Sequence, residues 1–152
     1  MSDWIDDLKR AEETKDRAQR QSEEWRLRCD RLIAAKAPDL WRALVERVAS
    51  DVKRLAEEFP DRDSMRLEFV ERSEDHFRLT NPSQHQNFMA VWVPNERIIS
   101  LEFRNRPDAL SDMQVRRDTI RFFVTNQDDV QMKFGGTVLL ESISERLIKE
   151  VL

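Results

Sequence analysis

Five arginines bracket one segment in the second half of the chain and form a concentrated group of like charges. Arg104 and Arg106 end one predicted strand, and Arg116, Arg117 and Arg121 open the next. If these strands are neighbours, four or five guanidinium groups meet near one sheet end, where they could bind phosphate or carboxylate through paired hydrogen bonds. Acidic residues in the same segment could neutralise the cluster internally: Asp108, Asp112 and Asp118. The cluster predicts a small-anion site as one alternative for the function.

The histidines and the single cysteine do not indicate a metal site or a nucleophile. His76 and His85 have only two neighbouring carboxylates, whereas zinc sites usually need three or four closely spaced ligands. Cys29 falls on an apolar helix face, which favours a buried structural thiol. We expect no metal, no cofactor and no internal disulfide.

No motif in the sequence is typical of an enzyme. The two glycines, Gly135 and Gly136, are adjacent, so the chain has neither a glycine-rich phosphate loop nor a G-x-S-x-G nucleophile motif. The 30 Asp and Glu residues are abundant, but nothing in their spacing selects one pair for acid–base chemistry. The sequence therefore favours a non-enzymatic protein.

The first element that must position these residues is a long helix over residues 3–37, a stretch without glycine or proline before Pro38 and with Asp3 as its N-cap. Apolar and small residues recur on one face in steps of four and three, the heptad spacing of a coiled coil, with Lys15 and Ser22 as interruptions. The candidate self-association surface consists of this face and one adjacent residue: Trp4, Ile5, Leu8, Ala11, Ala18 and Trp25.

A second amphipathic helix is predicted over residues 39–59, where an uninterrupted apolar stripe begins at Trp41. Pro38 either starts this helix or kinks one continuous helix. The two helices together form a predicted helical segment over residues 1–62.

Residues 63–152 are predicted to form an antiparallel meander of about six to seven strands, with a C-terminal helix packed on the sheet. A 14-residue connection, Asn105 to Asp118, separates two strands. The Gly135-Gly136 pair predicts a hairpin that leads into a last strand at 138–140. Ser142 and Glu145 have the spacing of a capping box at the start of the final helix.

This order of elements predicts an α+β fold with segregated helices and strands. The sheet is either open or closed into a barrel. A barrel would be similar in element order to the pleckstrin-homology-like barrels, in which a C-terminal helix closes one end. The resemblance concerns topology alone, no motif supports it, and it implies no function.

The predicted first helix is longer than the domain to which it belongs, so one of its ends should be exposed. A helix over residues 4–36 is about 50 Å long, whereas a compact globule of this size is only about 40 Å across. Its apolar N-terminal residues would be bare unless a second copy of the chain or a partner protein covers them, or unless the helix breaks between Lys15 and Ser22 and folds back. We expect an interaction or assembly module that self-associates, most simply as a homodimer, through this helix.

Composition excludes several other classes. The 26 Lys and Arg against 30 Asp and Glu give a net charge of −4 without a basic block, so nucleic-acid binding is not expected. The sequence contains no run of about 18 apolar residues, the length that a membrane-spanning helix needs. The acidic N-terminus does not resemble a secretory signal, and we expect a cytoplasmic protein.

Overall fold

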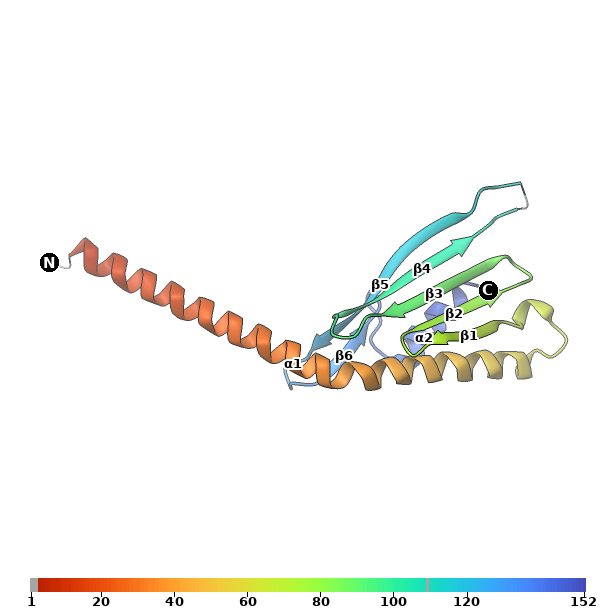
Figure 1. Cartoon of the computed structure of the whole chain (residues 1–152), viewed down its shortest axis with the longest axis horizontal. Coiled ribbons are helices and arrows are strands. Elements are labelled where there is room, and N and C mark those ends of the chain that lie inside the picture. Colours follow the sequence, from red (N-terminus) through yellow and green to blue (C-terminus); the bar gives the residue numbers. More distant parts are fainter. Residues whose placement is uncertain (1–2, 109) are drawn as a thin grey trace.

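The computed structural model describes residues 3–108 and 110–152. The chain forms one long helix, a six-stranded antiparallel sheet and a C-terminal helix (Figure 1). This confirms the predicted α+β class. Among the described residues the strands follow one another from β1 to β6 and the two end strands do not pair, so the sheet is open rather than a barrel.

Helix α1 (Trp4–Glu58) is continuous, so of the two alternatives for Pro38 the single helix is present and the division into helices over 3–37 and 39–59 is not. The Asp3 side chain caps its first turn by accepting a hydrogen bond from the amide of Ile5 at 3.2 Å. Pro38 lies inside the helix on its exposed side. The carbonyl that would pair with its missing N–H can therefore face water, while Ala37 and Trp41 pack into the core and hold both flanks in place.

The sheet is a simple meander in which each strand pairs with the next one along the chain. A short 3-10 turn, Asp63–Met65, connects α1 to the sheet. The strands are β1 (Glu68–Ser73), β2 (His76–Asn81), β3 (Gln86–Trp92), β4 (Ile98–Asn105), β5 (Gln114–Val124) and β6 (Val130–Lys133).

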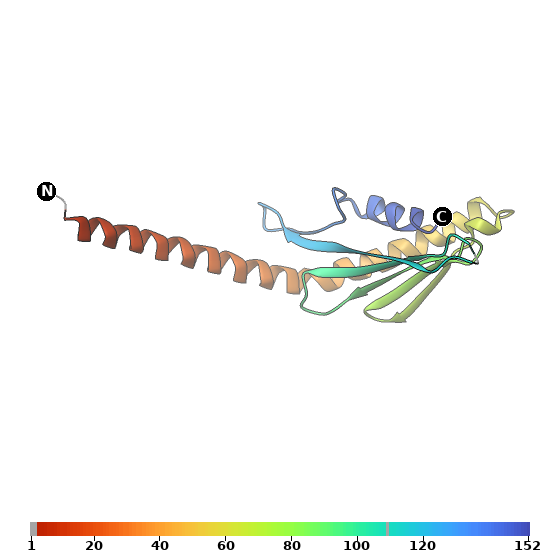
Figure 2. The same ribbon diagram turned by 90° about the horizontal axis from the view of Figure 1, so that it is seen from above.

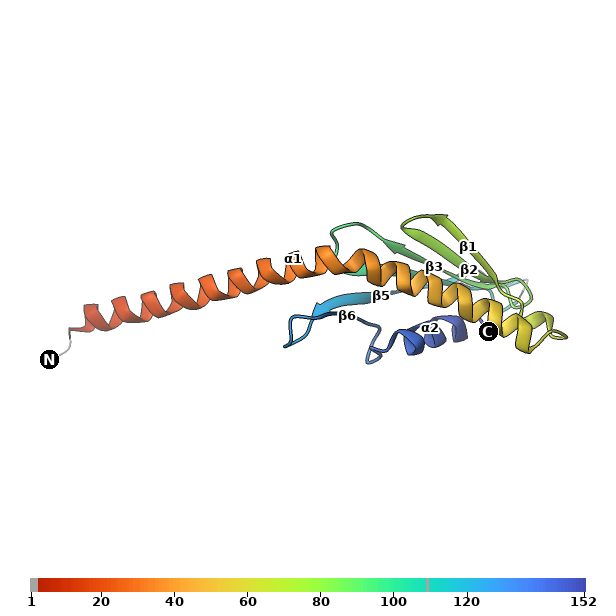
Figure 3. The same ribbon diagram turned by 90° about the horizontal axis from the view of Figure 1, so that it is seen from below.

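The core lies between one face of the sheet and both helices. Alternate strand residues such as Phe77, Phe88 and Ile120 are fully buried there against α1. Helix α2 (Leu140–Lys149) lies beside the C-terminal half of α1 on the same side of the sheet (Figures 2 and 3). The opposite side carries neither helix, and we call it the open face.

Two local predictions are wrong. Strand β5 begins at Gln114, so the connection after β4 is shorter than the predicted segment from Asn105 to Asp118. The start of this strand lacks the alternation of apolar and polar residues that predicts a strand. Its core face carries a charged residue, Arg116, which lies over the Phe103 ring at 4.4 Å. After the glycine hairpin there is no strand at 138–140, since α2 already begins at Leu140.

The predicted capping box at Ser142 is also absent. The N-cap position is held by Leu139, whose side chain makes no capping bond. The helix starts early because Leu140 packs against the core. Ser144 is fully buried instead, and its hydroxyl donates to the Asp51 carboxylate of α1 at 2.8 Å, which ties the two helices together.

Candidate functional site

The N-terminal part of α1 extends away from the rest of the molecule (Figure 1). Every residue from 3 to 28 is exposed. We call residues 4–28 the projecting segment; at 1.5 Å per residue it is about 37 Å long. The predicted overhang is therefore present, and the alternative in which the helix breaks between Lys15 and Ser22 and folds back is not.

The predicted self-association residues all lie on this segment. Trp4 is 72% exposed, Leu8 53% and Trp25 47%, which is unusual for side chains of this size. Ala11 and Ala18 continue the same helix face between them. Ile5 and Leu27 are also more than half exposed, although they lie off that face.

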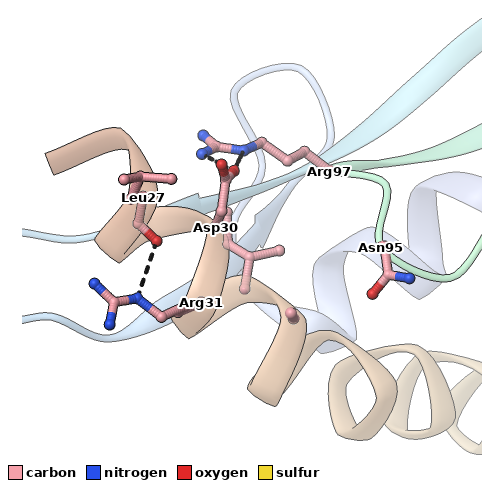
Figure 4. A pocket seen from close by; sticks show the side chains of 7 residues that line it. Leu27, Asp30, Arg31, Asn95 and Arg97 are labelled. Atoms are coloured by element: carbon pink, nitrogen blue, oxygen red, sulfur yellow. Dashed lines mark hydrogen bonds and ion pairs between the residues drawn. The ribbon is translucent and has the colours of Figure 1, made fainter. Parts of the chain in front are cut away.

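The projecting segment is anchored where it meets the sheet. The Arg97 guanidinium donates to the Asp30 carboxylate, with Nε at 2.8 Å, and also to the carbonyl of Arg26 at 3.3 Å. Arg28 forms an ion pair with Asp128 in the β5–β6 loop. Beside these contacts an open cavity of about 720 Å³ separates α1 from the β3–β4 loop (Figure 4). These contacts fix the direction in which the segment leaves the sheet.

The structure divides the five predicted anion-binding arginines between two sides of the sheet. Arg116 is paired with Phe103 and lies on the core face. Arg104, Arg117 and Arg121 alternate with core residues and lie on the open face. Arg106 follows β4, where its amide donates to the carbonyl of His85. The five do not form one site.

Internal carboxylates neutralise three of these arginines. Arg116 binds Glu150 of the C-terminal segment at 2.7 Å and also contacts Asp118. Arg104 and Arg117 share the carboxylate of Glu102, at 3.0 and 3.7 Å. Internal neutralisation by Asp118, considered from the sequence, is thus present for one arginine, and Glu102 and Glu150 complete it.

Arg121 differs from these three because it faces a lysine. Its cross-strand partner on β6 is Lys133, and neither side chain makes a hydrogen bond or ion pair within residues 3–108 and 110–152. Lys133 did not belong to the predicted cluster. The Gly135-Gly136 turn indicates a strand ending near Lys133, but only the β5–β6 register reveals which residue lies opposite.

His76 is half-buried and Cys29 is buried. Burial lowers the pKa of His76, and the nearby charges of Arg72 and Arg78 lower it further. Cys29 is 6% exposed, as the prediction of a buried thiol requires. Across the described part of the chain, no three His, Cys, Asp or Glu side chains come together in a way that could hold a metal ion.

Comparisons with known proteins give no match: no family model, curated protein or solved structure is significantly similar to this chain. Within the described residues, neither helix has an apolar stretch long enough to cross a membrane.

Proposed function

We propose that this protein is a non-enzymatic assembly module whose projecting segment pairs with the same segment of a second copy. The observation that carries the proposal is the exposed apolar face from Trp4 to Trp25 on a helix that contributes nothing to the core before Cys29. Covering that face removes apolar surface from water, which favours association at about 25 cal/mol per Å² of buried area.

A second copy fits this face best in the antiparallel orientation. Heptad geometry allows Leu8 of one chain to lie opposite Trp25 of the other, and the same register places Lys15 opposite Ala18. Leu8 and Trp25 of each chain would then be covered. A parallel, in-register pair would instead place Lys15 beside its own copy, where two like charges repel.

The residues that flank the face also suit antiparallel pairing. In this register Glu12 lies opposite Gln19, and Thr14 lies opposite Gln21, so no like charges meet at these positions. Because Ala11, Ala18 and Ser22 bury little surface, the pair is expected to be weak and concentration-dependent.

Light scattering over a range of protein concentrations tests the proposal. We expect the mass to rise toward that of a dimer, and Leu8→Glu or Trp25→Glu to hold the chain at the monomer mass. Glu13→Gln and Arg20→Gln, on the opposite side of the helix, are the matched controls and should leave association unchanged. A wild-type mass that stays monomeric at every concentration would refute self-association.

Cross-linking tests the orientation separately. In a Cys29→Ala background, chains carrying Glu12→Cys are mixed with chains carrying Gln19→Cys. An antiparallel pair should give disulfide-linked dimers from the mixture and few from either variant alone. Dimers that fail to cross-link in the mixture would retain self-association but overturn the antiparallel register.

A further inference from the structure

Two like charges face each other without compensation at one end of the open face. Arg121 of β5 is directly opposite Lys133 of β6 in the antiparallel register. Such a pair is destabilising relative to a neutral or opposite-charge pair. Two other arginines on this face are compensated, since Arg104 and Arg117 share Glu102. Arg121 and Lys133 have no carboxylate partner in the described part of the chain.

These two cations line an open cavity of about 440 Å³. Ile98 is the cross-strand partner of Arg121 on β4, and Phe123 follows two residues later on the same face of β5. Val138, 37% exposed, contributes an apolar wall beyond β6. A volume in this range is typical of sites for small organic ligands.

The arrangement of polar and apolar groups restricts what can bind. The cations lie in the middle of a row, with Ile98 on one side and Val138 on the other. Arg97 also borders the cavity, but its guanidinium is already bonded to Asp30. The two remaining cationic groups favour an anion, and the walls favour an apolar body attached to it.

We propose that this cavity, the Arg121–Lys133 pocket, binds a small oxyanion carried on an apolar group, such as an arylalkyl carboxylate or an aryl phosphate ester. The oxyanion would accept hydrogen bonds from the Arg121 guanidinium and the Lys133 ammonium group. The apolar part would pack on Ile98, Phe123 or Val138. Binding of the anion would relieve the repulsion between the two cations, and this relief would contribute to the free energy of binding.

Calorimetry with defined probes tests the pocket on the full chain. We expect binding of 3-phenylpropionate, of phenyl phosphate, or of both, and which of them binds identifies the source of the oxyanion. The neutral analogue 3-phenylpropanamide lacks the charge and acetate lacks the apolar body, so both should bind at least about tenfold more weakly.

Substitutions then locate the site. Arg121→Gln and Lys133→Gln should each weaken the binding of the preferred probe by about tenfold or more. Arg117→Gln is the matched control, because this arginine lies on the same face of the same strand but is paired with Glu102. It should leave the affinity unchanged.

The variants also report on folding independently of ligand. Without ligand, Arg121→Gln should unfold at the wild-type temperature or above it, because it removes a repulsive pair. Failure of wild-type protein to bind either anionic probe would overturn the proposal, as would equal losses in Arg121→Gln and Arg117→Gln. Neither result would bear on self-association, which uses other residues.

Discussion

Gly135 illustrates how a single residue shapes the C-terminal part of the sheet. It has a φ of +58°, in the left-handed region that side chains disfavour. A Cβ atom at this position would lie 3.0 Å from Nη1 of Arg146. That guanidinium donates to the carbonyl of Phe134 and lies over its ring at 4.2 Å, so it links α2 to the hairpin.

Gly135→Ala is therefore expected to destabilise the fold by about 1–2 kcal/mol, because it imposes the left-handed penalty and displaces Arg146. Urea unfolding measures this as a lower transition midpoint. Gly136→Ala is the matched control, since a Cβ there has no atom within 4 Å and the backbone is outside the left-handed region. Equal midpoints for the two variants would show that the strained turn does not limit stability.

At the residue scale, the sequence identified the arginine-rich segment but not the partners of its side chains. Pairing of Arg117 with Glu102, or of Arg121 with Lys133, depends on strand register. Sequence alternation does not fix that register, because the charged start of β5 was indistinguishable from a loop. The exposed apolar residues of α1 were predictable, since their spacing is a local property of the helix.

At the scale of elements, α1 shows that tertiary packing can outweigh a local helix breaker. Pro38 removes one backbone donor, yet the helix continues because buried residues on both sides pack against the sheet. The class of fold and the antiparallel order were predictable from periodicity. The continuation of α1 through Pro38 and the start of α2 at Leu140 were not, because they depend on contacts with distant elements.

Restoring the missing donor should stabilise α1. Pro38→Ala is expected to raise the free energy of unfolding by up to about 3 kcal/mol, since the new N–H can bond to the carbonyl of Ala34. Chemical denaturation measures the change. Asp39→Ala, at the adjacent exposed position, keeps its own N–H and should change stability by less than about 0.5 kcal/mol. A loss of stability in Pro38→Ala would contradict a continuous helix at this point.

At the scale of the whole molecule, α1 combines two environments in one element. Residues 4–28 are exposed to solvent, whereas Trp41, Leu44 and Val48 are buried in the core. A helical segment without tertiary contacts lacks the packing that gives most protein helices their stability, and a partner that covers it would stabilise it.

Hydrogen exchange followed by mass spectrometry should resolve these two environments. In dilute protein, amides of the projecting segment should exchange much faster than those of residues 41–52. Raising the protein concentration should slow exchange in the projecting segment alone, because pairing covers only that part. Protection of the segment that is strong and independent of concentration would contradict the proposed pairing.

The absence of a loop within α1 has a mechanical consequence. The N-terminal end of α1, which a second copy would contact, and the C-terminal end, which packs on the sheet, belong to one rigid helix without a hinge between them. Near the middle of α1, the ion pairs of Arg28 with Asp128 and of Arg97 with Asp30 hold the helix against the sheet. Two chains paired through such rigid helices would hold their sheets at a fixed distance and angle to each other.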